Sequence, residues 1–273
     1  MSAEPIELRF PRPSVMGILN VTPDSFSDGG VHFGDPDAAA GSARRMIEAG
    51  AAIVDLGGES TRPGADGVSL DEELRRVVPV LERLEGVPVS IDTAKAEVAR
   101  RALALGAEMV NDVTALRGDP ELAGAVADSG AYLCLMHMKG EPRSMQRNPV
   151  YDDVVGEVTA FLEERLGAAV AAGVPEERIC LDPGIGFGKT VEHNMELLRR
   201  LGVVAELGRP LLVGVSRKSS LGRLLGDPAA TRGTLAASLG AAVSAFDHGA
   251  SILRVHDVRE HVEALTIAAA VEG

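Results

Sequence analysis

Eight short apolar segments recur along the chain, and longer segments with helical periodicity lie between them. The eight are VMGILN, AIVDLG, VPVSID, EMVND, YLCLM, ICLDP, LLVGVS and ILRVH. Each is continuously apolar rather than alternating, which is typical of strands buried on both faces of a parallel sheet. Eight strand–helix units in 273 residues predict an α/β fold of the (β/α)8 TIM-barrel type. A doubly wound open sheet is the competing topology.

The alternation of segments continues from end to end without a linker rich in Ser, Gly or Pro. Residues 1–273 are therefore expected to form a single domain, with the barrel core at about 14–272. Three helix starts carry recognisable chemistry, namely the pair Asp35–Pro36, the capping box from Ser69 to Glu72, and the pair Asp119–Pro120.

Charge and cysteine content narrow the possible partners. Forty acidic and 27 basic side chains give a net charge of -13, which disfavours binding to nucleic acids or anionic membranes. Cys134 and Cys180 lie inside apolar segments, which favours reduced buried thiols and a cytoplasmic location over disulfides or a metal site. No basic-then-apolar segment opens the sequence and no apolar run is long enough to span a bilayer, so neither a leader peptide nor a membrane span is expected.

Polar side chains gather where the apolar segments end. They are Asn20, Asp55, Asp92, Asn111, Asp112, His137, Asp182, Ser216, Arg217, Lys218, Arg254 and His256. TIM-barrel enzymes place their active sites at the carboxyl ends of the strands. Any one of these residues could instead cap the following helix, but caps require neither Arg, Lys nor His. The set as a whole therefore indicates an active site.

A first group consists of hydrogen-bond acceptors, namely Asp92, Asn111 and Asp182. The side-chain amide of Asn111 can also donate. Such a group on nonadjacent strands suits a small nitrogen-rich heterocycle. A divalent metal held by Asp92 and Asp182 is the alternative, although hard cations usually take more oxygen ligands than these two residues supply.

A second group is cationic and comes from GVSRKS and RVH, at the ends of the last two apolar segments. The loops after the last two strands commonly form the phosphate site of a barrel. Arg254 and His256 are two residues apart and so leave a strand on the same side, where they could hold a phosphorylated substrate. The alternative is an ion pair with Asp257 or Glu260.

Three loops follow the second, fifth and sixth apolar segments, with the sequences ESTRPGA, HMKGEPRSMQ and DPGIGFGK. The glycines of the last loop superficially resemble a phosphate cradle, but their spacing fits neither GxGxxG nor a P-loop. A tight turn that presents Phe187 to the pocket is the favoured interpretation.

Eight motifs together resemble the dihydropteroate synthase family, the folate-pathway enzymes that sulfonamides inhibit. In order, from Met16 to about Val262, they are GILNVTPDSFSDGG, GGESTRPGA, SIDT, NDV, LMHMKGEP, DPGIGFGK, GVSRKS and RVHDV. The resemblance implies a TIM barrel that joins 4-aminobenzoate to 6-hydroxymethyl-7,8-dihydropterin diphosphate, with loss of pyrophosphate. It also implies a requirement for Mg2+ and a homodimer formed through C-terminal helices, for which 257–272 is the candidate.

The resemblance assigns site residues position by position. Those implied for the pterin are Asp92, Asn111, Met136, Asp182, Lys218 and Arg254. Those implied for the diphosphate are Asn20, Arg254 and His256, with Asn20 also the metal ligand. Those implied around aminobenzoate are Phe26, Thr61, Arg62, Pro63, Phe187 and Ser216. The residues expected to act in catalysis are Asn20, Asp92, Lys218, Arg254 and His256.

The loop after the first segment is then expected to close over the site with Phe26, Asp24 and Asp28.

Two alternative functions remain. One is a methyltransferase of the same fold that transfers a methyl group from a reduced folate to a corrinoid, and the other is a noncatalytic pterin-binding homologue. The SRKS and RVH motifs argue against the first, and the TRP and SRK motifs against the second. Ser220 departs from the larger apolar residue usual in relatives. No Phe-Gly insertion associated with resistance is evident, so ordinary sulfonamide sensitivity is expected.

Overall fold

Eight parallel strands close into a barrel in chain order. The computed structural model describes residues 4–22, 34–60, 67–141 and 143–272. The strands are β1 (Ser14–Asn20), β2 (Ile53–Gly57), β3 (Val89–Asp92), β4 (Met109–Asp112), β5 (Tyr132–Met136), β6 (Ile179–Asp182), β7 (Leu211–Val213) and β8 (Ala250–Val255). Because β1 pairs with both β2 and β8, the sheet has no edge. The predicted TIM barrel is confirmed, and the open sheet is excluded.

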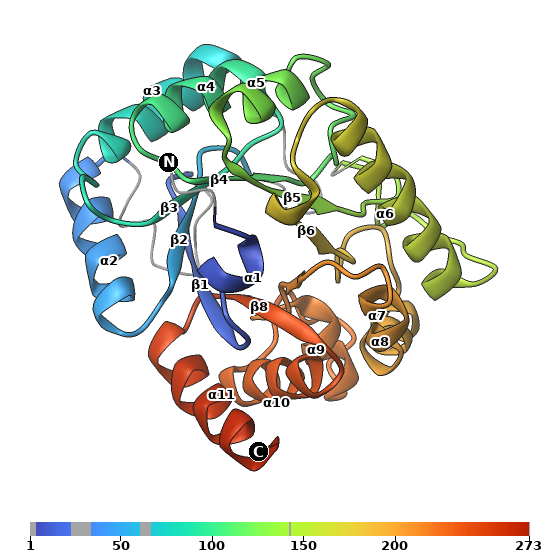
Figure 1. Ribbon diagram of the computed structural model, residues 1–273. Helices are drawn as coiled ribbons and strands as arrows, with labels where there is room; N and C mark the ends of the chain where they lie inside the picture. The colour runs from blue at the N-terminus through green and yellow to red at the C-terminus, as the bar shows by residue number, and fades with distance from the viewer. Residues whose placement is uncertain (1–3, 23–33, 61–66, 142, 273) are drawn as a thin grey trace.

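Helices form a ring outside the barrel (Figure 1). They are α2 (Pro36–Glu48), α3 (Leu70–Leu81), α4 (Ala96–Ala104), α5 (Leu122–Ser129), α6 (Val154–Ala171), α7 (Val191–Arg199), α8 (Leu201–Ala205), α9 (Ser219–Leu224), α10 (Leu235–Asp247) and α11 (Val258–Glu272). A short helix α1 (Ile6–Arg9) precedes β1, and a 3-10 turn η2 (Glu176–Arg178) precedes β6. Across the described ranges, no helix combines the length and the apolar character that crossing a membrane requires.

Two of the three predicted helix starts are confirmed. Asp35 caps α2 by accepting from the N–H of Ala38, and Ser69 caps α3 by accepting from the N–H of Glu72. The reciprocal half of the predicted capping box is not formed, because the carboxylate of Glu72 accepts from Arg75 and Arg76 instead. The third prediction is wrong. α5 begins only at Leu122, and its N-cap residue Glu121 makes no side-chain cap bond. Asp119 instead serves two units: its Oδ1 accepts from the N–H of Glu121 at 3.0 Å in the turn before α5, and its Oδ2 accepts from the N–H of Ala96, the first residue of α4, at 2.9 Å.

The seventh strand is shorter than its apolar segment. The segment LLVGVS extends to Ser216, but β7 ends at Val213. Beyond it the chain turns: the N–H of Lys218 donates to the carbonyl of Val215, and Arg217 has φ +58. The turn moves Ser216 and Lys218 off the strand and into the loop at the carboxyl end of the barrel.

The barrel interior changes from apolar to polar along the strands. At the amino end, Met16, Ile53 and Met109 pack with Ile6 and Phe10, and α1 thereby covers this end of the barrel. The buried thiols of Cys134 and Cys180 are free and face each other in register on β5 and β6.

At the carboxyl end the inward positions are polar. Strand register aligns Asn20 with Gly57, Gly57 with Asp92, and Asp92 with Asn111. Since side chains two residues apart on a strand share a face, this register alone gathers the polar set at one mouth.

Candidate active site

The mouth of the barrel holds three buried acceptor side chains. Asp92, Asn111 and Asp182 end β3, β4 and β6 or lie next to the end, and each is at most 7% exposed. Burial raises the pKa of Asp182 above its ordinary value. Burial and the nearby carboxylate of Asp55 raise the pKa of Asp92 to about 8, against the opposing effect of Arg254. The structure brings these three predicted residues together, but the expectation of nonadjacent strands is wrong for Asp92 and Asn111, which are register partners on the neighbouring strands β3 and β4.

Arg254 on β8 reaches across the mouth to two carboxylates. Its Nε donates to Oδ2 of Asp55 at 2.7 Å, and its Nη2 donates to Oδ2 of Asp92 at 3.0 Å. The alternative of an ion pair with the residues after β8 is wrong for Asp257, which instead pairs with Arg217 at 2.5 Å. Arg254 therefore belongs to the mouth of the barrel.

Asp55 is a further member of this cluster, and no role was predicted for it from the sequence. It is fully buried on β2, and its Oδ2 also accepts from Nδ2 of Asn111 at 2.9 Å. A signal was present in the sequence, because an aspartate inside the continuous apolar segment AIVDLG has no solvent to face and needs a buried partner.

Lys218 lies beside the acceptors. Its Nζ is 4.2 Å from the centre of the Phe187 ring. Burial lowers the pKa of Lys218 to about 8, although the carboxylates of Asp182 and Asp92 favour its charged form. Phe187 packs in turn against an apolar cluster of Val113, Met136, Met138 and Met145. The predicted residues Met136, Phe187 and Lys218 therefore line the same side of the mouth.

The glycines of the loop after β6 form a turn. Gly184, Gly186 and Gly188 all have positive φ, between +63 and +84. The N–H of Gly184 donates to Asp182 at 2.7 Å, and the N–H of Gly186 donates to Asn194 at 2.8 Å. With these donors already used, the loop is not a phosphate cradle, in agreement with the interpretation as a turn.

Lys189 holds this turn together from inside. Its buried Nζ lies 2.9 Å from the carbonyl oxygen of Gly184, 3.1 Å from that of Phe187 and 2.9 Å from Nδ1 of His137. Burial lowers the pKa of His137 to about 2, so His137 is neutral. Three acceptors thus surround the lysine and tie the loops after β5 and β6 together. The sequence did not assign Lys189.

The stability contribution of Lys189 is expected to depend on pH. Burial lowers its pKa from 10.5 to about 7. The folded state therefore binds fewer protons than the unfolded state between these values, and stability rises with pH in this window. The unfolding free energy of wild type relative to Lys189→Met should rise by about 2 kcal/mol from pH 7 to pH 9. Urea denaturation at several pH values measures it, with Arg223→Met, which removes an exposed cation on α9, as control. A flat difference would contradict a lowered pKa.

Ser216 and His256 contact each other, although the sequence assigned them to different ligands. The N–H of His256 donates to Oγ of Ser216 at 3.2 Å, and Nδ1 of His256 lies 3.1 Å from the same oxygen. The hydroxyl of Ser216 therefore fixes the imidazole ring of His256. The aminobenzoate and diphosphate regions implied by the resemblance adjoin at this pair.

Asn20 and Asp92 face each other across Gly57. A Cβ added to Gly57 would lie 3.1 Å from Oδ1 of Asn20 and 3.8 Å from Oδ2 of Asp92. Among residues 4–22, 34–60, 67–141 and 143–272, no group of three or more His, Cys, Asp or Glu side chains could hold a metal ion. The side-chain oxygens of Asn20 and Asp92 fit Mg2+, because this ion commonly binds one or two protein oxygens and takes its other ligands from phosphate and water.

Several predicted residues lie outside the described part of the chain. They are Phe26, Thr61, Arg62 and Pro63, together with Asp24 and Asp28. In the loop after β2, the residues on either side of 61–66 are described, and there Oε1 of Glu59 accepts from the N–H of Val68 at 3.3 Å. Glu59 also pairs with Lys95, which pairs with the fully buried Glu73 at 2.5 Å.

Ser220 is buried, and its Oγ has no hydrogen-bond partner among the described residues.

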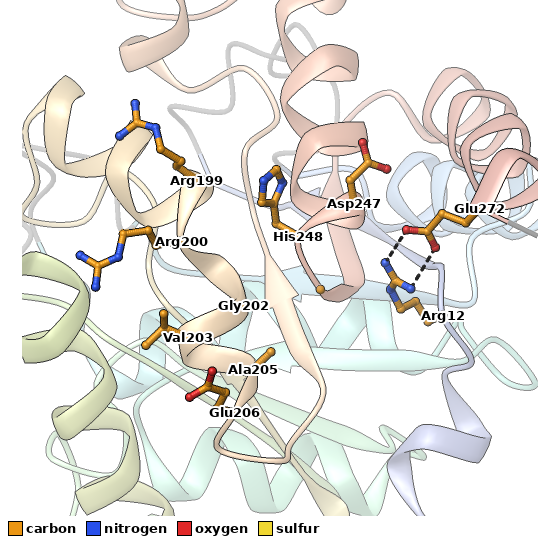
Figure 2. Close-up of a pocket in the computed structure, with 11 residues that line it drawn as sticks. Arg12, Arg199, Arg200, Gly202, Val203, Ala205, Glu206, Asp247, His248 and Glu272 are labelled. Atoms are coloured by element: carbon orange, nitrogen blue, oxygen red, sulfur yellow. Dashed lines mark hydrogen bonds and ion pairs between the residues drawn. The ribbon is translucent and has the colours of Figure 1, made fainter.

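A separate hollow of about 710 Å³ lies outside the barrel, where α8, the end of α10 and the end of α11 meet (Figure 2). Arg12 and Glu272 form an ion pair on its wall, with N–O distances of 3.1 and 3.2 Å. None of the predicted site residues lines it. The hollow is therefore distinct from the cluster at the carboxyl ends of the strands.

The fold and the polar cluster define a class, the TIM-barrel enzymes that bind pterins. Residues 16–256 match the family described as "Pterin binding enzyme". Within this class the chain belongs to the dihydropteroate synthase family, because a relative of that name covers nearly its whole length at 50% identity. The resemblance drawn from the motifs is thereby confirmed.

Three similar proteins illustrate the match. The dihydropteroate synthase of Neisseria meningitidis serogroup C is 50% identical over 95% of this chain and 93% of its own length. The structure of the Yersinia pestis enzyme with a sulfonamide drug complex has a TM-score of 0.90 at 47% identity, covering 96% of this chain and 95% of that one. The Xanthomonas albilineans enzyme in complex with 7,8-dihydropteroate has a TM-score of 0.83 at 47% identity, covering 97% and 95%.

Proposed function

We propose that the chain is a transferase of folate biosynthesis. It condenses 6-hydroxymethyl-7,8-dihydropterin diphosphate with 4-aminobenzoate and releases 7,8-dihydropteroate and pyrophosphate. The observation that carries this proposal is the cluster of buried acceptors facing Arg254 and Lys218 at the carboxyl ends of the strands. The X. albilineans relative, with the same fold, binds 7,8-dihydropteroate, the product of this reaction.

In this proposal the pterin ring lies in the mouth of the barrel. Its N–H groups donate to Asp92 and Asp182, while Asn111 can both donate and accept. Lys218 donates to a ring acceptor, and Met136 and Arg254 lie against the two faces of the ring. Charge-assisted bonds in a buried site give both orientation and affinity.

The diphosphate is assigned to Asn20, Arg254 and His256. Asn20 supplies a neutral oxygen for Mg2+, which when bound would neutralise part of the diphosphate charge. Arg254 brings a permanent positive charge to the departing oxygens, because a guanidinium stays protonated even when buried. Ser216 orients His256, which can donate to the same group. These contacts stabilise the charge that develops as pyrophosphate leaves.

The amine needs little help from the protein. An arylamine is neutral near pH 7 and already carries its lone pair, so the enzyme chiefly has to weaken the bond between the pterin methylene and the diphosphate. In their ionised forms, Asp92 and Asp182 favour positive charge that spreads over the pterin as this bond lengthens. Phe187 and Ser216, with Phe26, Thr61, Arg62 and Pro63, are proposed to surround 4-aminobenzoate.

The release of pyrophosphate tests this function. Purified protein given pterin diphosphate and Mg2+ should release pyrophosphate in proportion to added 4-aminobenzoate and form 7,8-dihydropteroate. Methyl transfer to a corrinoid without pyrophosphate would instead support the methyltransferase alternative. Pterin binding without turnover would support the noncatalytic one.

Replacing Asp182 by asparagine is expected to weaken pterin binding. The asparagine can still accept from the N–H of Gly184, so the turn survives, but the charge-assisted pair is lost. The cost should be about 1.5 to 3 kcal/mol, or roughly 10- to 100-fold in Kd. Isothermal titration with 6-hydroxymethyl-7,8-dihydropterin measures it. Asp153→Asn is the matched control, since Asp153 likewise accepts from an N–H two residues on. Unchanged affinity in folded Asp182→Asn would place the pterin elsewhere.

A homodimer and a cytoplasmic location complete the proposal. Ile267 and Val271 lie one turn apart on α11 and are 67% and 81% exposed, which suits a helix that packs against a second copy. Light scattering coupled to size exclusion measures the assembly, and Ile267→Lys should favour the monomer. The free thiols of Cys134 and Cys180 are compatible with a reducing compartment.

A further inference from the structure

Asp55 is a buried carboxylate one layer beneath the proposed pterin site. It lies in the middle of β2, in register with Ile18 on β1 and Ser90 on β3, and none of its surface is exposed. Its Oδ2 accepts from Nε of Arg254 at 2.7 Å and from Nδ2 of Asn111 at 2.9 Å. Both donors belong to the residues proposed to hold the pterin.

Fold stability alone does not account for this carboxylate. Removing an ionised carboxylate from water costs several kcal/mol, and well-packed apolar residues often stabilise a fold as much as a buried ion pair does. The other oxygen of Asp55, Oδ1, has no hydrogen-bond partner among the described residues. The register neighbour Ile18 shows that an apolar side chain suits this layer.

The contacts of Asp55 orient Arg254. The guanidinium is held at Nε by Asp55 and at Nη2 by Asp92. Without Asp55, Asp92 would be the remaining carboxylate that accepts from Arg254. Both Nε and Nη2 of Arg254 would then be free to donate to Asp92. A guanidinium presents parallel N–H donors much as the amino edge of a pterin does, so it would then compete with the pterin for Asp92.

The contacts of Asp55 also orient Asn111. A carboxylate accepts but does not donate, so the amide of Asn111 must turn its NH2 group toward Asp55. The carbonyl oxygen of the amide is thereby directed away from Asp55 and is available to a ligand donor. A neutral partner in place of Asp55 would allow either orientation of the amide.

We propose that Asp55 is a positioning residue for the pterin diphosphate substrate. It acts through Arg254, whose guanidinium it draws away from Asp92, and through Asn111, whose amide it orients. Asp55 does not itself contact the substrate. This inference rests on the proposed function and adds to it a residue behind the binding site.

The test is Asp55→Asn in the full-length enzyme. The KM for pterin diphosphate should rise roughly 10- to 100-fold, as for the loss of a charge-assisted contact, while the KM for 4-aminobenzoate changes less than twofold. Ser90→Ala is the matched control, because Ser90 is the buried register neighbour of Asp55 and contacts neither Arg254 nor Asn111 by any hydrogen bond in the described residues. It should leave both constants unchanged.

A double-mutant cycle separates positioning from general damage. In an Arg254→Gln background, Asp55→Asn should weaken the binding of 6-hydroxymethyl-7,8-dihydropterin by a smaller factor than in the wild-type background, because one of the two residues through which it acts is gone. Equal costs in both backgrounds, or an equal rise in both KM values, would overturn the proposal. Asp55→Ser, which is smaller, serves as a second variant should Asp55→Asn not fold. If wild type itself released no pyrophosphate, the proposed function would fail instead.

Discussion

Replacing Arg254 by glutamine is expected to lower kcat/KM for pterin diphosphate by about a thousandfold or more. Within the described part of the chain, the Arg254 guanidinium alone hydrogen-bonds to both Asp55 and Asp92, and it is proposed to hold the departing diphosphate as well. Loss of one preorganised group that stabilises transition-state charge costs about 3 to 4 kcal/mol. Steady-state assays of pyrophosphate release measure the effect.

Arg254→Lys is the control for this prediction. It keeps the positive charge but loses the forked donors, so its rate should lie between those of wild type and Arg254→Gln. The glutamine variant also leaves two buried carboxylates without a cation, which should lower the unfolding free energy by about 3 kcal/mol. A loss of less than tenfold in kcat/KM would remove Arg254 from the diphosphate site.

The largest effect on stability is expected from Gly184→Ala. A Cβ at this position would lie 1.9 Å from the carbonyl oxygen of His137, and Gly184 has φ +68. Neither loop can relax easily, because Lys189 ties them together. We expect a loss of about 4 kcal/mol in unfolding free energy, by analogy with severe overpacking combined with backbone strain.

Gly208→Ala is the matched control for Gly184→Ala. Gly208 has φ +75, but nothing lies within 4 Å of an added Cβ, so only the backbone strain remains, at about 1 kcal/mol. Chemical denaturation of both variants gives the difference. Activity should fall with Gly184→Ala as well, because the turn places Phe187 against Lys218. Equal losses of stability would mean that the two loops do not approach so closely.

The order of the strands and the position of the site could be predicted because their causes are local or general. A segment buried on both faces is continuously apolar, and parallel strands joined by helices place all their carboxyl ends on one side. The residues at those ends, such as Asp92, Asn111 and Asp182, therefore lie at one mouth of the barrel whatever structure the other segments adopt. The family motifs then predicted a pterin as the ligand of this mouth.

The pairing of side chains within the mouth depended on the closed barrel. Asp55 and Arg254 are 199 residues apart in the chain, and only the closure of β8 onto β1, which pairs in turn with β2, brings them together. No local pattern distinguishes Asp257 from Asp55 as the partner of Arg254, and sequence proximity favoured Asp257. The same reason explains Asp119, whose second carboxylate oxygen accepts from the first N–H of α4 in the preceding unit.

The sequence by itself determined that this chain forms a TIM barrel with a polar, pterin-compatible mouth. Both the apolar periodicity of the strands and the polar residues at the strand ends depend only on the local order of residues. The tertiary structure decided which partners the buried polar side chains take: Arg254 pairs with Asp55 and Asp92, and Lys189 donates to the carbonyl groups of Gly184 and Phe187. A buried charge takes whichever partner the packed fold brings within hydrogen-bond distance, and that distance is set by strand register and loop approach rather than by separation along the chain.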